Sequence, residues 1–307
     1  MKKIALIYGG LGQNGYLLTK FLRSKKYKIY SLIRTHKKSR KFKNVTYLKL
    51  NFSNYENVLN LIKKINPDEI YNFLGPSDKK SFKNNLQHYF EKDFKLNLYT
   101  LESCRFLNIK TKIFYSSSSE VFGNFKRKVS EKSKRIIVNE YALTKNMSEL
   151  LIEFYRINFK INACYGVLFN HDSTYRKNKF LYKTILNFFE KKKFNKPILI
   201  KNINDIKYRS NAEEFVKIFW KILQKRELND YLISANKPIS VKNLIKKISL
   251  KYNVNLIWKK DLKKIKIFNK NKLIIEGIEK GNQYNLRPNL EKLKKNLDIN
   301  FKKINLF

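Results

Sequence analysis

Apolar positions follow two different periodicities along the first half of the chain. Short unbroken apolar runs are typical of buried parallel strands, and they alternate here with stretches in which apolar residues recur every three or four positions, as in amphipathic helices. Strict alternation of strand and helix predicts a parallel sheet with helices on both faces. The predicted strands cover 4–8, 27–33, 45–50, 69–73, 113–116 and 161–168, and the predicted helices cover 12–25, 58–65, 86–107 and 141–159.

The pattern becomes less regular after about residue 170. Helices are predicted over 180–191, 211–224 and 240–252, with Ser240 as an N-cap, and short strands over 198–200 and 231–234. The lysine-rich, low-complexity stretch 259–272 predicts a surface excursion.

We therefore expect an α/β protein in two parts. A Rossmann-type doubly wound parallel sheet occupies residues 1–168, and a smaller, interleaved C-terminal substrate-binding lobe occupies most of 169–307. Segments near 197–235 are expected to return to the sheet. Within the predicted helix 141–159, the aromatic residues Phe154, Tyr155 and Phe159 are expected to belong to the core.

A glycine-rich turn joins the first predicted strand to the first predicted helix. Its sequence is Gly9-Gly-Leu-Gly12-Gln-Asn-Gly15. In this context Gly9 permits a sharp turn, Gly12 lets backbone amides approach a pyrophosphate, and Gly15 lets the helix pack closely on the strand. The helix N-terminus adds partial positive charge. The turn predicts a dinucleotide cofactor, and a glycine-rich turn without a ligand is the alternative.

The end of the second predicted strand bears on which dinucleotide is bound. NAD-selective folds of this kind place an acidic residue there to hold the ribose hydroxyls. This chain has Ser31-Leu-Ile-Arg34-Thr-His-Lys37, which contains no acid. Arg34 suits a 2′-phosphate, so the sequence favours NADP over NAD. The alternative is that Arg34 is one more basic residue in a basic protein.

A cluster of reactive side chains follows the fifth predicted strand. Ser116-Ser-Ser-Ser119 runs into Glu120, and the next helix begins with Tyr141 and Lys145. Residues four apart share a helix face, so the lysine charge lowers the pKa of the phenol and allows it to act as a base. A nearby serine can share the proton. Glu120 suits a reaction that also moves a carbon-bound proton, such as elimination of water beside a ketone.

Composition excludes several classes of protein. The chain has 67 basic and 24 acidic residues, a net charge of +43, but the lysines are spread in pairs and triplets such as 191–193. This spread favours solvated surface lysines over a nucleic-acid-binding face. Cys104 and Cys164 stand far apart, so we expect two buried thiols, no disulfide and no metal site. No apolar run approaches the ~20 residues of a membrane span, and a cytoplasmic location is expected.

The chain resembles the GDP-mannose 4,6-dehydratases over most of its length. The supporting segments are the glycine turn with the strand before it, Glu69-Ile-Tyr-Asn72, the Ser-Glu cluster with Val121-Phe-Gly123, and the Tyr–Lys pair. The most specific segment is Gly166-Val-Leu-Phe-Asn-His-Asp-Ser173, because related epimerases and decarboxylases usually differ there. Arg287-Pro288 and the stretch Leu290-Glu-Lys-Leu-Lys-Lys-Asn-Leu297 resemble the end of the family's chain.

The resemblance implies a role for each matching residue. Ser118 takes the place of a catalytic threonine, Glu120 is the base at C5 and the acid for the C6 hydroxyl, and Tyr141 takes the C4 hydroxyl proton. Lys145 tunes Tyr141 and holds the ribose. The cofactor-binding set is Gly9, Gly12, Gln13, Asn14, Gly15, Arg34, Asn51, Phe52, Ser77, Tyr141, Lys145, His171 and Arg176, and the substrate-binding set is Ser118, Ser119, Asn170, Lys179, Arg209 and Arg287.

The reaction implied by the resemblance converts a GDP-linked hexose to its 4-keto-6-deoxy form, with bound NADP and no metal. A homodimer or homotetramer is implied as well. The chain departs from the family at Asn14 and Asn51, where the family has aspartate, and over 174–179 and 207–209. These departures leave the sugar open.

Two alternatives remain open. The first is an epimerase, reductase or decarboxylase that acts on a nucleotide sugar. The second is a non-catalytic Rossmann protein that binds RNA through its basic surface.

Overall fold

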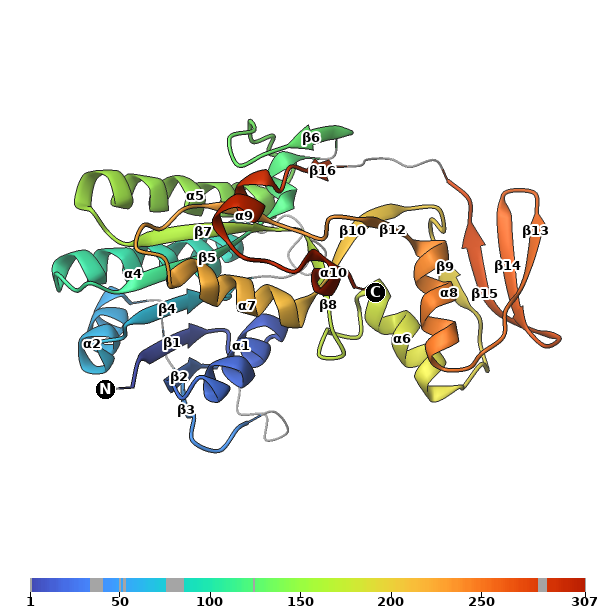
Figure 1. The fold of residues 1–307 in the computed structure, drawn as a ribbon, viewed down its shortest axis with the longest axis horizontal. Helices are drawn as coiled ribbons and strands as arrows, with labels where there is room; N and C mark the ends of the chain where they lie inside the picture. The colour runs from blue at the N-terminus through green and yellow to red at the C-terminus, as the bar shows by residue number, and fades with distance from the viewer. Residues whose placement is uncertain are drawn as a thin grey trace.

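Seven parallel strands form the central sheet in the computed structural model (Figure 1), which describes residues 2–33, 41–49, 51, 54–75, 86–123, 125–280 and 286–306. The strand order is β11-β7-β5-β4-β1-β2-β3, as in doubly wound folds, in which ligands bind at the carboxyl edge where the order reverses beside β1. The strands are β1 (Ile4–Tyr8), β2 (Lys28–Leu32), β3 (Thr46–Leu48), β4 (Glu69–Asn72), β5 (Lys112–Ser118), β7 (Ala163–Leu168) and β11 (Tyr231–Ile233).

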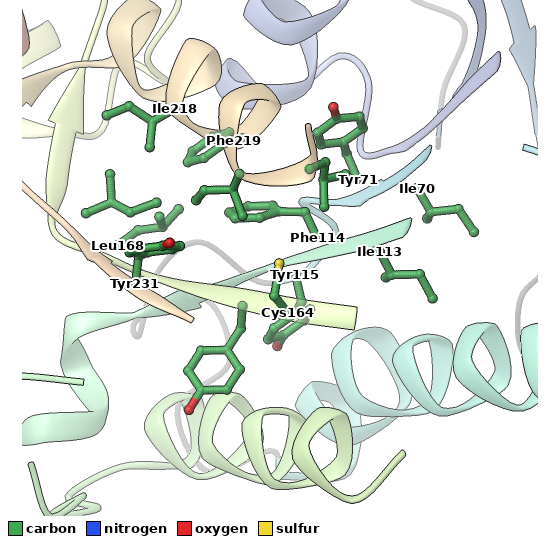
Figure 2. Close-up of a cluster of buried hydrophobic side chains, with 14 of the residues drawn as sticks. Ile70, Tyr71, Ile113, Phe114, Tyr115, Cys164, Leu168, Ile218, Phe219 and Tyr231 are labelled. Atoms are coloured by element: carbon green, nitrogen blue, oxygen red, sulfur yellow. The ribbon is translucent and has the colours of Figure 1, made fainter. Parts of the chain in front are cut away.

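Helices cover both faces of this sheet, as the alternating pattern predicts. Helices α1 (Gln13–Ser24) and α7 (Ala212–Leu223) pack together on one face, and α2 (Tyr55–Ile65), α4 (Lys95–Phe106) and α5 (Glu140–Phe159) cover the other (Figure 1). Figure 2 shows the core between β5 and α7, where the rings of Phe114 and Phe219 stack with their centroids 4.7 Å apart. Tyr115, the next residue in β5, lies on the opposite face, toward α4 and α5.

The predicted helix over 86–107 contains a change of winding. It consists of α3 (Leu86–Tyr89), the π-helical turn η2 (Phe90–Phe94) and α4. A π turn inserts an extra residue and shifts the phase of the side chains that follow, so such turns are frequent at functional sites. Here the shifted residue is Asp93, whose side chain is buried beside β5.

A second hydrophobic cluster lies in the C-terminal lobe. Strands β13 (Ile257–Asp261), β14 (Lys264–Asn269), β15 (Lys272–Ile278) and β9 (Ile198–Ile200) form a four-stranded sheet, covered by α6 (Leu181–Lys191) and α8 (Val241–Lys251). The prediction of a surface excursion over 259–272 was wrong. Ile265 and Ile267 alternate with lysines in β14, and their side chains are buried while the lysines face outward.

The two parts are interleaved. Residues 212–233 return to the large sheet, where α7 packs on one face and β11 forms an edge strand. Strand β9, in contrast, belongs to the lobe. A three-stranded sheet of β8 (Asn170–Asp172), β10 (Ile206–Asn211) and β12 (Pro238–Ser240) lies between them. The predicted cap at Ser240 is present, because its side chain accepts a hydrogen bond from the Asn243 amide at 3.1 Å.

The last elements of the chain return toward the large sheet. Strand β16 (Leu286–Pro288) pairs with β6 (Arg127–Val129), which precedes α5. The short helices α9 (Glu291–Asn296) and α10 (Phe301–Ile304) follow, and their Leu293 and Ile304 side chains join the main core. No helix in the described ranges has the length and apolar character needed to cross a membrane.

The prediction that Phe154, Tyr155 and Phe159 all belong to the core was only partly right. Tyr155 is buried, but Phe154 and Phe159 are 52% and 41% exposed. The helical repeat turns Leu150, Phe154 and Ile157 away from the sheet, and Leu150 and Ile157 are more than half exposed. An apolar stripe therefore lies on the face of α5 that the sheet does not cover.

Candidate active site

Most of the predicted site residues that the structure describes gather at the carboxyl edge of the large sheet. They come from the glycine turn after β1, the end of β5 with the 3-10 turn η3 (Ser119–Phe122), the first turns of α5, and β8. Because β1, β4, β5 and β7 are parallel neighbours, their carboxyl ends converge there. Three predicted residues, Arg34, Phe52 and Ser77, lie outside the described residues.

The glycine turn has the geometry that a sharp strand-to-helix connection needs. Gly9 has a φ of 80°, in the left-handed region that favours glycine. A Cβ on Gly15 would lie 2.4 Å from the Gly9 carbonyl oxygen, so only glycine allows α1 to approach β1 this closely. Gly12 is the N-cap of α1, and its amide donates to the Gly9 carbonyl at 2.9 Å.

Gln13 and Asn14 use their side chains to hold β8 against this turn. Gln13 Nε2 donates to the His171 carbonyl at 3.1 Å, and Ser173 Oγ donates to Gln13 Oε1 at 3.0 Å. The side-chain amide of Asn14 lies 2.9 Å from His171 Nε2. Residues about 160 positions apart thus form one unit, because the side chains of Gln13 and Asn14 bind β8 and the serine that follows it.

His171 is held on all sides by protein. Its Nδ1 lies 2.8 Å from the Phe169 carbonyl oxygen, and its ring stacks on Phe215 at 4.6 Å. Burial, assisted by the positive charge of Arg176, lowers the pKa of His171 to about 4, so the imidazole is neutral at physiological pH. Both ring nitrogens have protein partners, so this histidine joins the glycine turn to the lobe.

The serine, tyrosine and glutamate of the catalytic cluster converge at the start of α5. Ser118 caps η3, and its Oγ accepts from the Glu120 amide at 3.3 Å. The pKa of Tyr141 lies above its ordinary value, because burial outweighs the charge of Lys145 and a hydrogen bond with Ser118, which act to lower it. Asp93 and Glu120 also act electrostatically on Tyr141, and both raise its pKa. Three charged groups, those of Lys145, Asp93 and Glu120, therefore act on the Tyr141 phenol.

Lys145 is buried in a cage that the sequence does not reveal. Its Nζ lies 3.0 Å from Asp93 Oδ2 and donates to the Tyr115 hydroxyl at 3.1 Å and the Ser116 carbonyl at 2.9 Å. Burial alone would lower the pKa of Lys145, but Asp93, Tyr115 and Tyr141 more than reverse this effect, so the pKa lies above its ordinary value. Lys145 is therefore a permanent positive charge, 5.8 Å from the centroid of the Tyr141 ring.

A second buried network lies behind the serines. Ser117 Oγ donates to Glu149 Oε1, and Arg135 Nε donates to Glu149 Oε2 at 2.8 Å. Ser116 Oγ donates to the Asn72 carbonyl at 2.9 Å. Ser116 and Ser117 thus hold β5 in place, whereas Ser118 at the end of the strand and Ser119 at the start of η3 take no part in these contacts.

Two arginines share one buried carboxylate beside β8. Arg209 Nη1 lies 3.0 Å from Asp172 Oδ2, and Arg176 Nε lies 3.5 Å from Asp172 Oδ1. The Arg176 guanidinium also lies 3.9 Å above the Phe180 ring, and its Nη1 donates to the His171 carbonyl. One carboxylate for two guanidinium groups leaves an excess positive charge, which suits a phosphorylated ligand.

The remaining predicted residues are more dispersed. Asn170 pairs with Arg209 in the β8–β10 register, and Lys179 is exposed near Phe180. Arg287 is exposed on β16, beside Lys126, Arg127 and Lys128, in a pocket of about 370 Å³. Asn51 is exposed, and its backbone carbonyl accepts from Asn57.

A comparison with protein families identifies the family of the chain. The family model described as GDP-mannose 4,6 dehydratase matches residues 6–303. The chain belongs to this family. The resemblance found in the sequence is thereby confirmed, and the doubly wound sheet with its Ser-Tyr-Lys cluster is the fold expected of the family.

Individual relatives of the GDP-mannose 4,6-dehydratase family cover most of the chain. A GDP-mannose 4,6-dehydratase of Vibrio cholerae is 28% identical over 80% of this chain and 70% of its own length. A GDP-mannose 4,6 dehydratase of Dictyostelium discoideum is 26% identical over 86% of this chain and 80% of its own.

Solved structures share the fold. A UDP-glucose 4-epimerase of Thermotoga maritima superimposes with a TM-score of 0.81, covers 98% of this chain and 95% of its own, and is 12% identical. A dTDP-glucose 4,6-dehydratase of Bacillus anthracis superimposes with a TM-score of 0.77, covers 97% of this chain and 91% of its own, and is 16% identical.

The neutral, buried His171 predicts an acid-sensitive fold. Its pKa of about 4 lies below the value of about 6.5 expected in the unfolded chain, so the unfolded state binds a proton first as pH falls. The stabilisation is complete above pH 6.5, and roughly 3 kcal/mol should be lost between pH 6.5 and 4. Urea unfolding of the unchanged protein and of His171→Gln should show their difference in stability shrinking over this range. A difference that does not vary with pH would contradict the assignment.

Proposed function

We propose that the protein is a nucleotide-sugar 4,6-dehydratase that converts GDP-mannose, or a close GDP-linked sugar, to the 4-keto-6-deoxy sugar with tightly bound NADP. The observation that carries this proposal is the convergence of Glu120 with Ser118, Tyr141 and Lys145 at one sheet edge. A carboxylate that acts on the catalytic phenol suits water elimination better than simple oxidation or reduction. The family supports the GDP-linked substrate.

The glycine turn fits a dinucleotide. Gly12 caps α1, and among the described residues a Cβ there would meet only the Gly9 carbonyl oxygen. The N-terminus of α1 therefore faces a space that a pyrophosphate can enter. In this proposal Gly9, Gly12 and Gly15 shape the phosphate site, Tyr141 and Lys145 face the nicotinamide ribose, and Arg34 favours the 2′-phosphate of NADP. A dinucleotide held there would supply hydride transfer, from C4 of the sugar and back to C6.

The protein side chains move the protons. Tyr141 accepts the C4 hydroxyl proton as a phenolate, which the charge of Lys145 stabilises against the opposing effect of burial, and Ser118 holds the same oxygen. The resulting ketone acidifies the proton on C5. Glu120 then removes the C5 proton and donates a proton to the C6 hydroxyl, which departs as water. One carboxylate thus serves as base and then as acid. Return of the hydride to C6 requires a proton at C5, and the proton that Tyr141 accepted from the C4 hydroxyl balances it, so both side chains end in the protonation states in which they began.

Positive charge suits the substrate phosphates. Arg176 and Arg209 share Asp172, and Arg287 lies beside three further basic residues. We assign the diphosphate of the substrate to these arginines, with Asn170, Ser119 and Lys179 toward the rest of the nucleotide sugar.

Denaturing the purified protein and identifying the released dinucleotide by mass spectrometry tests the cofactor. Incubating the intact protein with GDP-mannose and analysing the product by NMR tests the reaction. Bound NADP with a 4-keto-6-deoxy product is the expected result. Bound dinucleotide without this product would redirect the proposal to other nucleotide sugars, to epimerisation or to decarboxylation. Neither dinucleotide nor product, with salt-sensitive retention of RNA, would favour the non-catalytic alternative.

Glu120→Gln should reduce formation of the 4-keto-6-deoxy product at least 100-fold, because the amide can neither take the C5 proton nor release one. It should also abolish exchange of the C5 hydrogen with D₂O, which NMR measures directly. Glu227→Gln is the matched control, since Glu227 is exposed on the loop after α7. Normal turnover by Glu120→Gln would rule out the assigned role.

We infer also that the chain forms a homodimer through α4 and α5. These helices pack side by side, and they expose large apolar side chains on Phe106, Leu150, Phe154 and Ile157. The Arg105 guanidinium lies 5.1 Å from the Phe159 ring, which joins the two helix surfaces into one face. Contiguous apolar surface of this kind is typical of a protein–protein interface.

Ile157→Asp should convert the dimer to a monomer, because it places a charge in an interface that buries the apolar stripe. Light scattering after gel filtration measures the mass. Leu250→Asp is the control, since Leu250 is 71% exposed on α8, outside the proposed interface. A mass unaffected by Ile157→Asp, or equally reduced by Leu250→Asp, would argue against this interface.

A further inference from the structure

The ammonium group of Lys145 has no donor left for a ligand. A lysine ammonium carries three N–H donors. In the structure they reach Asp93 Oδ1 at 3.3 Å, the Tyr115 hydroxyl at 3.1 Å and the Ser116 carbonyl oxygen at 2.9 Å. The lysine side chain is only 5% exposed, so the cage is closed. Any ligand hydroxyl that binds this lysine must displace one of these three acceptors.

The three acceptors differ in how easily they can be displaced. Asp93 is a buried carboxylate, and separating it from the lysine would leave two unpaired charges in the interior. The Ser116 carbonyl belongs to the backbone of β5, whose register with β7 holds it in place. The Tyr115 hydroxyl is neutral, and hydrogen bonds from a charged donor to a neutral group are weaker than those to a carboxylate. Tyr115 is therefore the acceptor that gives way.

Tyr115 is held in place by the same turn that supplies Asp93. Its hydroxyl donates to Asp93 Oδ1 at 2.9 Å, and its ring centroid lies 4.6 Å from Lys145 Nζ. The π-helical turn η2 carries Asp93 inward against Gly75, where a Cβ would lie 3.1 Å from the carboxylate. The tyrosine thus bridges the lysine and its counter-ion.

We propose that Tyr115 sets the affinity of the enzyme for its dinucleotide, because its hydroxyl occupies the Lys145 donor that a ribose hydroxyl takes. This inference rests on the proposed function, in which Lys145 faces the nicotinamide ribose. Removing the hydroxyl frees a donor in advance and leaves the Asp93–Lys145 ion pair intact. A tyrosine with a purely structural role would have the opposite effect, since its loss would loosen the site and weaken binding.

The test is the dissociation constant of NADPH for dinucleotide-free protein, measured by fluorescence titration. Tyr115→Phe should bind NADPH about fivefold more tightly, the equivalent of one hydrogen bond of about 1 kcal/mol. Tyr71→Phe is the matched control. Tyr71 is buried in neighbouring β4, and its hydroxyl donates to the buried Glu69 carboxylate at 2.7 Å, away from Lys145. The affinity of Tyr71→Phe for NADPH should remain within about twofold of that of the unchanged protein.

Unchanged or weaker binding by folded Tyr115→Phe would overturn the inference, as would equal tightening in Tyr71→Phe. If Tyr115→Phe does not fold, Tyr115→Met replaces it, because methionine fills similar space without a hydroxyl. This variant should also bind NADPH more tightly than the unchanged protein. If the unchanged protein binds NADPH but neither Tyr115 variant binds it more tightly, only this inference is wrong and the proposed function stands. No NADPH binding by the unchanged protein, with no dinucleotide released on denaturation, removes the proposed NADP site as well.

Discussion

The buried ammonium of Lys145 constrains the structure around it more than any other single group. An isolated charge in a protein interior is very costly, so each element near this lysine must offer it a partner. Strand β5 provides a carbonyl and a hydroxyl, and the turn η2 provides a carboxylate. The π turn in the long helix, its approach to Gly75 and the register of β5 together place these three partners around the ammonium group. The result is a fixed positive charge beside Tyr141.

The glycine turn imposes a second constraint, which joins the two parts of the chain. Gly15 brings α1 so close to β1 that the side chains of Gln13 and Asn14 emerge directly opposite β8. Their hydrogen bonds to His171 and Ser173 fix the start of the three-stranded sheet that leads to the lobe. Arg209 stands on β10 of this sheet, and Arg176 follows β8. The geometry of the glycine turn therefore helps to determine where these two arginines, which we propose for the substrate side, lie.

The sequence predicted the features that depend on local patterns. Buried parallel strands are continuous apolar runs, so the large sheet was visible, and the positions of Ser118, Tyr141 and Lys145 relative to it followed. What the sequence could not show depends on contacts between distant segments. Asp93 lies in a helical pattern, and nothing nearby reveals a π turn. Tyr115 is indistinguishable from a core tyrosine. In β14, lysines obscured the alternation of Ile265 and Ile267, so a true strand was interpreted as a surface excursion.

The surface is about as one-sided as the net charge of +43 suggests. Glu69, Asp93, Glu149 and Asp172 are all buried, and each is paired with a lysine or arginine. These acids are therefore hidden from solvent, while most lysines remain exposed. A surface with so few visible carboxylates attracts phosphorylated ligands over distances limited by the Debye length, about 8 Å at physiological ionic strength. Inside the site the balance differs, because Asp93 and Glu120 oppose Lys145 around Tyr141. The exposed charge thus acts on the approach of an anionic substrate, and the buried charge acts on the phenol.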